Sequence, residues 1–105
     1  MTPSELAKVA QWLGPYWGWN YNDDGRTVVW KFDDRRISDA DLLLACLERL
    51  AEEGWRVELS DDGPERGPRR YWCEGTRYGE TEIDVAQTGP TWLAAVLAAV
   101  LEVAK

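Results

Sequence analysis

The spacing of hydrophobic positions changes along the chain between a helical and a strand-like period. Leu6, Val9, Ala10 and Leu13 recur at the spacing of an amphipathic helix. The segment 2–5 before them reads Thr-Pro-Ser-Glu, which supplies an N-cap threonine, a proline in the first turn and a glutamate that closes a capping box. This pattern predicts a first helix that ends near Leu13.

A period of two replaces the helical spacing over residues 16–32. Aromatic and aliphatic residues alternate with smaller or polar ones, and Asn-Asp-Asp-Gly interrupts them at 22–25. The Asp-Gly pair is a strong hairpin signal because glycine tolerates the positive φ of a tight turn. The segment therefore predicts a β-hairpin that carries Trp17, Trp19 and Trp30.

The rest of the chain returns to helical spacing, then to alternation, then to helical spacing again. Ser38 is positioned to cap the second helix, and Gly54 to end it. A turn-rich segment at 60–68 is expected to be a surface loop. The predicted elements are a helix over 38–53, strands over 55–60, 69–74 and 78–86, and a closing helix that Gly89-Pro90 opens and that runs to Lys105.

The resulting order is α-β-β-α-β-β-β-α, with mostly short connections that favour antiparallel neighbours. We expect an α+β fold in which one antiparallel sheet of about five strands packs with three helices. A chain of 105 residues can bury one modest core. A single domain over 1–105 is therefore expected.

The closing helix is apolar on all sides, because residues 93–101, which follow Trp92, are all Leu, Ala or Val. Such a helix needs burial on more than one side. It is either a central helix packed within the chain, or a homodimer interface formed by the 90–104 helix. The run is too short to cross a bilayer, which requires about 20 apolar residues, so no membrane association is expected. Close approach of a second copy would be permitted by Ala94, Ala95, Ala98 and Ala99.

The charge balance narrows the class of partner. Twelve Lys and Arg against nineteen Asp and Glu give a net charge of −7. Binding to a phosphate backbone needs a basic face, so direct nucleic acid binding is not expected, and basic partners are favoured. Glu80, Glu82 and Asp84 alternate along a predicted strand, where residues two apart lie about 6.7 Å from each other. They form either a row that mimics nucleic acid phosphates or an ordinary exposed strand face.

The residue types needed for most catalysis are missing. Histidine is absent, which removes the commonest general base and the commonest metal ligand. Cys46 lies on an apolar helix stripe and Cys73 in a strand, so both are interpreted as small buried hydrophobes. The paired acidic residues lie in turns or at helix ends and lack the spacing of a calcium loop. No enzyme activity, cofactor or metal site is expected, and the two cysteines favour a reduced, cytoplasmic protein.

Seven tryptophans are many for a chain of this length. Core packing explains some of them, but a hairpin covered on one side leaves indole surface for a contact patch, where Trp is a favoured anchor. Trp17, Trp19 and Trp30 are the tryptophans of this candidate patch.

Residues 40–55, with a helix closed by Glu-Glu-Gly-Trp, and residues 89–104, with an Ala-rich helix after the last strands, resemble the phage ABA sandwich domain. This is a family of small bacteriophage proteins. The likeness spans 38–105 and consists of helix-strand-helix patterning, and the Trp-rich hairpin is not part of it. The resemblance implies a phage or prophage accessory protein of the host cytoplasm, with an alpha-beta-alpha layered arrangement and no catalytic residues to carry over.

Together these observations favour a non-enzymatic phage or prophage accessory protein that binds a host protein through an acidic or Trp-rich surface. It would act as an inhibitor, an anti-defence factor or a host-takeover factor. The expected contact residues are Trp17, Trp19, Trp30, Glu80, Glu82 and Asp84. The alternative is a protein that binds or sequesters a small molecule or nucleotide, by stacking on aromatic rings and by phosphate contacts. Those contacts would come from Arg35, Arg36, Arg69 and Arg70.

Overall fold

The described part of the chain contains three helices and five strands in the order expected from the sequence. The computed structural model describes residues 2–21, 27–31, 36–63, 67, 69–79 and 82–104, with the backbone alone at 20–21 and 27–31. The helices are α1 (Pro3–Leu13), α2 (Asp39–Glu52) and α3 (Trp92–Val103). The strands are β1 (Trp17–Tyr21), β2 (Thr27–Lys31), β3 (Trp55–Asp61), β4 (Tyr71–Arg77) and β5 (Ile83–Gly89).

Each helix begins at a hydroxyl side chain that caps its first turn. The Glu5 backbone N–H donates to Thr2 Oγ1 at 3.2 Å, and the Thr2 backbone N–H donates to Glu5 Oε1 at 3.0 Å, which completes the predicted capping box. The hydrogen bonds that the Glu5 carboxylate accepts from the backbone and then from the side chain of Thr2 hold the pKa of Glu5 below its usual value of 4.5. Ser38 and Thr91 cap α2 and α3 through their own hydroxyl oxygens.

The last two strands are shifted from their predicted positions. β4 continues through Gly75, where the sequence predicts a break, and β5 begins only at Ile83. A side chain at position 75 would bring its Cβ within 3.1 Å of Val85 Cγ2 and 3.4 Å of the Trp55 ring. Gly75 therefore lies within the central strand, where the side chains of Val85 and Trp55 occupy the space next to its Cα.

The strands divide into two antiparallel sheets and do not form the single sheet of about five strands that the sequence predicts. β1 pairs with β2 in the expected hairpin, and β3, β4 and β5 form a separate sheet with β4 in the centre. The α+β class with three helices and antiparallel pairing is confirmed. The division arises because α1 packs against the hairpin, whereas α2 and α3 pack against the three-stranded sheet.

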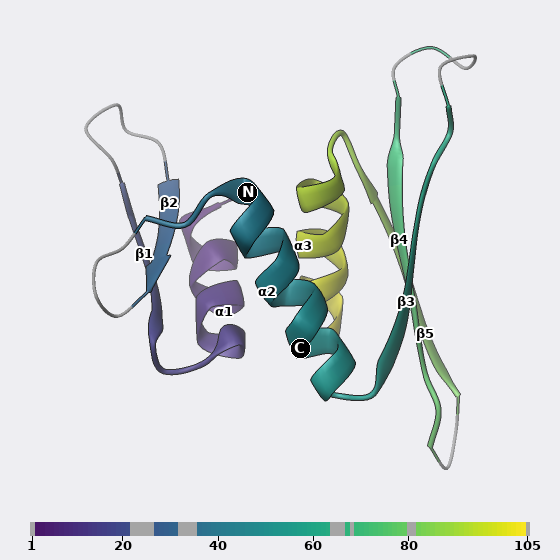
Figure 1. Ribbon diagram of the computed structural model, residues 1–105, viewed down its shortest axis with the longest axis horizontal. Helices are drawn as coiled ribbons and strands as arrows, with labels where there is room; N and C mark the ends of the chain where they lie inside the picture. Colours follow the sequence, from purple (N-terminus) through teal and green to yellow (C-terminus); the bar gives the residue numbers. More distant parts are fainter. Residues whose placement is uncertain are drawn as a thin grey trace.

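Figure 1 shows the resulting layers, with the β1–β2 hairpin on one side, the three helices in the middle and the β3–β4–β5 sheet on the other side. The helices thus lie between two β layers, which differs from the alpha-beta-alpha order that the resemblance implies. One face of the three-stranded sheet contacts α2 and α3. No element of the described part lies over its opposite face (Figure 1).

α3 is the most deeply buried helix of the described chain. Ala95, Val96, Ala99 and Val100 are at most 1% exposed, and the helix contacts β4, β5, α1 and α2. Packing within one chain therefore accounts for the apolar sequence of α3 on all sides. A homodimer through the 90–104 helix stays a prediction, but the apolar sequence of this helix no longer supports it.

None of the described helices combines the length and the apolar character needed to cross a membrane.

The junction between β5 and α3 is unusually tight. A Cβ atom at Gly89 would lie 2.8 Å from both the Ala94 Cβ and the Ala95 backbone N. The first turn of α3 therefore packs directly on the end of β5, and only glycine fits there without displacing the helix. This contact fixes α3 against the sheet and completes one core, whose largest fully buried side chains are Val9, Cys46, Leu50, Cys73, Val96 and Val100.

Candidate functional site

The residues that the sequence singles out lie on opposite sides of the molecule. Trp17 and Trp19 belong to β1 on the hairpin side, whereas Asp84 lies in β5 of the three-stranded sheet (Figure 1). Glu82 is exposed and lies just before β5. Glu80 lies outside the described residues. The acidic row and the hairpin tryptophans therefore do not form one surface.

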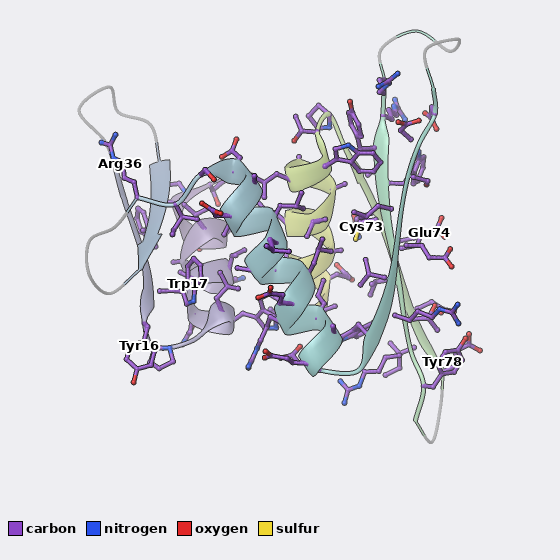
Figure 2. The ribbon with its side chains drawn as sticks, in the orientation of Figure 1. Tyr16, Trp17, Arg36, Cys73, Glu74 and Tyr78 are labelled. Carbon is purple, nitrogen blue, oxygen red and sulfur yellow. The ribbon has the colours of Figure 1, made fainter. Side chains whose placement is uncertain are left out.

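The hairpin tryptophans are half-buried. Trp17 and Trp19 pack against the edge of the core, and Figure 2 shows Trp17 pointing toward α1 while Tyr16 points away from the helices. Trp30 pairs with Gly18 in the hairpin register, and its side chain lies outside the described part. Among the described side chains at this end of the molecule, the aromatic ring that faces solvent is Tyr16, which is 68% exposed.

Packing between elements accounts for several other tryptophans. The Trp12 indole N–H donates to Glu53 Oε2 at 3.1 Å and links α1 to the C-cap of α2. Trp55 is a core residue, 7% exposed. The Trp92 ring meets the Tyr71 ring edge to face, with centroids 4.5 Å apart. The high tryptophan content is thus largely structural in the described chain.

The uncovered face of the β3–β4–β5 sheet carries side chains in three cross-strand rows. Residues directly opposite each other on antiparallel strands share a face. Figure 2 shows Glu74 pointing away from the helices and its neighbour Cys73 pointing toward them, which identifies the two faces. We call the uncovered surface the outer sheet face. Its rows from β3 to β5 are Arg56–Thr76–Asp84, Glu58–Glu74–Ala86 and Ser60–Trp72–Thr88.

The outer sheet face has an excess of negative charge. Glu58, Glu74 and Asp84 are exposed within the three rows, where Arg56 supplies the single positive charge. Glu82 adds a further exposed carboxylate beside them. Between the residues that the structure describes, ion pairs form only within α2 and its C-cap. No described basic side chain therefore forms an ion pair with the carboxylates of the outer sheet face.

Glu58 and Glu74 form a like-charge pair across the sheet. They are directly opposite each other in the β3–β4 register, and their row contains no basic residue. Directly opposite Cβ atoms lie about 4.5–5.5 Å apart, and like charges at this distance destabilise a sheet. A basic group placed over this row would remove the repulsion and gain attraction from both carboxylates.

Trp72 provides an aromatic ring on the same face. Its indole N–H donates to Asp62 Oδ1 at 2.9 Å, and its side chain is half-buried. Because the N–H group is already satisfied within the chain, the ring needs only apolar contact from a partner. The outer sheet face thus combines acidic groups with one oriented indole.

A groove lies between α1 and β1 on the hairpin side, with a volume of about 630 Å³. Ala7, Ala10 and Gln11 lie on one face of α1, and Gly14 at its C-cap continues this face. Of these four residues, the two alanines have only a methyl group and the glycine has no side chain. The tryptophans of β1 do not fill the space that these small residues leave. This α1–β1 groove is formed chiefly by Ala7, Ala10, Gln11, Gly14, Trp17 and Trp19.

The cysteines and the acidic residues offer little chemistry. Burial raises the pKa of Cys46 to about 12, and burial together with the nearby Glu74 carboxylate raises the pKa of Cys73 to about 11. Both thiols are free, and thiolate, the reactive form, is scarce at neutral pH. Within the described ranges, no three His, Cys, Asp or Glu side chains gather into a group that could hold a metal ion.

The arginines of the small-molecule alternative do not meet. Arg36 is exposed on the hairpin side (Figure 2), whereas Arg69 and Arg70 are exposed just before β4 on the other side of the molecule. Arg35 lies outside the described residues. A phosphate site built from these side chains is therefore not found in the described chain.

Three residues of the outer sheet face are not among the candidate residues that the sequence predicts, namely Glu58, Glu74 and Trp72. The alternation of β3 already indicates that Glu58 faces away from the core. Which residue of β4 lies opposite it depends on the register, for which the chain carries no local signal. Only the pairing of the strands brings the two glutamates and the indole onto one surface.

Comparisons of the chain with protein-family models, with curated proteins and with solved structures gave no match. The resemblance of residues 38–105 to the phage ABA sandwich domain therefore stays a prediction.

Proposed function

We propose that this protein is a binding protein without catalytic activity, which docks its outer sheet face on a basic surface of another protein. The observation that carries the proposal is the Glu58–Glu74 pair, two like charges directly opposite each other on an uncovered sheet face. Lysine and arginine side chains of a partner would neutralise these carboxylates. The surrounding negative field would speed association and reject acidic partners.

Trp72 serves as the apolar anchor of this contact. Interface energy concentrates in a few buried aromatic and arginine side chains, whereas exposed charges mainly set rate and specificity. The hydrogen bond to Asp62 holds the indole in one orientation, so that little ordering entropy is lost on docking.

The partner is a basic protein, and the resemblance to a phage family directs the search to bacterial host proteins. Blocking a basic host surface would make the chain an inhibitor, an anti-defence factor or a host-takeover factor.

The test compares two charge-matched double variants as bait in bacterial lysate. Glu58→Gln with Glu74→Gln removes two charges from the outer sheet face, and Glu48→Gln with Glu52→Gln removes two from the exposed side of α2. The partner is the protein that the wild type and the α2 variant retain and the sheet variant loses. Calorimetry on the purified pair should then give a dissociation constant that rises with salt, since screening weakens the attraction.

Equal capture by both double variants, or equal loss in both, would contradict docking through the outer sheet face. A salt-independent dissociation constant would contradict the electrostatic basis of the contact.

A further inference from the structure

We propose that the α1–β1 groove is a binding site for a neutral, planar aromatic molecule with an amide-like edge. The groove lies on the hairpin side, away from the outer sheet face (Figure 1). The inference therefore concerns a second site and does not depend on the proposed docking to a protein.

The size and aromatic wall of the groove favour a ring system of one or two rings. Its volume of about 630 Å³ falls within the roughly 300–1,000 Å³ typical of small-molecule sites. Trp17 and Trp19 are two residues apart on β1 and both line the groove. Indole rings contact other aromatic rings favourably in offset or edge arrangements. A planar aromatic ligand therefore gains more here than a saturated one of equal size.

The charge of the lining selects a neutral ligand. Acidic and basic residues make up 30% of the chain, yet no charged residue of the described part lines the groove. A charged ligand would meet no opposite charge on these walls, and the part of its hydration shell that they displace would not be replaced, which is unfavourable. The net charge of −7 adds a further barrier against anions.

Gln11 supplies the polar contact that orients the ligand. The Gly14 N–H donates to the Ala10 carbonyl and the Gly14 carbonyl accepts from the Trp17 N–H, each at 3.3 Å, so these backbone groups are already used. The Gln11 carboxamide is exposed at the groove and offers both a donor and an acceptor. A ligand edge with adjacent acceptor and donor groups can therefore form two hydrogen bonds with it.

The experiment titrates the full chain with quinoline-3-carboxamide and follows amide and indole N–H signals by NMR. Quinoline-3-carboxylate is the charged control and cyclohexanecarboxamide the saturated control. The carboxamide should shift the signals of Trp17, Trp19 and α1. Both controls should bind at least about tenfold more weakly, because each lacks neutrality or an aromatic face.

Two phenylalanine variants on α1 test the location. Ala7→Phe places a ring inside the groove and should weaken binding at least about tenfold, whereas Lys8→Phe places the same ring on the exposed neighbouring position and should change it less than about twofold. Gln11→Leu keeps the groove and should weaken binding several-fold through loss of the hydrogen bonds. It serves as the second probe if Ala7→Phe does not fold.

Absence of specific shifts at millimolar carboxamide, equal binding of the carboxylate, or binding that neither Ala7→Phe nor Gln11→Leu weakens would overturn the proposal. Such a failure would leave the outer sheet face untested, because neither variant alters it.

Discussion

Replacing Glu74 by lysine should stabilise the fold and at the same time weaken docking of a basic partner. Glu74 lies in the central strand, directly opposite Glu58 on β3 and Ala86 on β5. The substitution converts a like-charge pair into an opposite-charge pair, while glutamate and lysine have similar, low strand preferences. The change in stability therefore reports mainly the electrostatics of this row.

Cross-strand pairs of opposite charge contribute roughly 0.2–1 kcal/mol, and removal of the repulsion adds a similar amount. Because solvent-exposed pairs lie at the low end of this range, a total gain of about 0.5–1 kcal/mol is expected. For a chain of this length that corresponds to an increase of about 2–5 °C in Tm. Asp84→Lys is the matched control, because it changes the net charge equally but shares a row with Arg56. It should give no gain.

Thermal and urea unfolding at low and high salt measure the effect. Near 1 M salt the screening length falls to about 3 Å, so the advantage of Glu74→Lys should shrink by more than half. If Glu74→Lys were no more stable than the wild type, or if Asp84→Lys gained the same stability as Glu74→Lys, the like-charge pair would not be a source of instability. A gain that high salt left unchanged would refute the electrostatic cause.

Three further outcomes test the fold. Gly89→Ala should cost about 1–3 kcal/mol in urea unfolding, because its Cβ would meet the start of α3, whereas Gly79→Ala, with open space around it, should change little. The folded pKa of Glu5 is lowered, so the stabilising effect of its carboxylate is present above pH 4.5 and is lost as pH falls through the folded pKa. The Tm values of the wild type and Glu5→Gln should therefore converge in acid, and parallel curves of Tm against pH would contradict this. Cys46 and Cys73 should resist a thiol reagent at neutral pH until the chain is unfolded, and rapid labelling of the native protein would disprove their burial.

Local features of the fold could be predicted because each depends on neighbouring residues. The Thr2 capping box and the Ser38 cap are signals of a few residues, and α1 and α2 begin where they predict. The Asp-Gly signal at 24–25 lies outside the described residues, but β1 and β2 on either side of it pair antiparallel, as the hairpin prediction requires. α3 begins at the Thr91 cap, which has the same local character, whereas the sequence predicts that Gly89-Pro90 opens this helix.

Features that depend on distant contacts could not be predicted. The predicted strands leave a gap at 75–77, and only the Val85 and Trp55 side chains packed over Gly75 explain why a glycine lies within a strand there. The separation into two sheets likewise depends on which helix covers which strands, and the alternation pattern of a strand carries no record of its neighbour. The candidate site was found in part, since Asp84 and Glu82 border a patch whose centre is the Glu58–Glu74 pair.

The position of the helices between two β layers has a consequence for binding stoichiometry. The α1–β1 groove and the outer sheet face lie on opposite sides of the helix layer (Figure 1), so a ligand at one site cannot collide with a ligand at the other. Both proposed ligands, a small molecule and a protein, would therefore fit on one chain at once in a ternary complex. Any influence of one on the affinity of the other would have to pass through the packing of the three helices, and it would act equally in both directions.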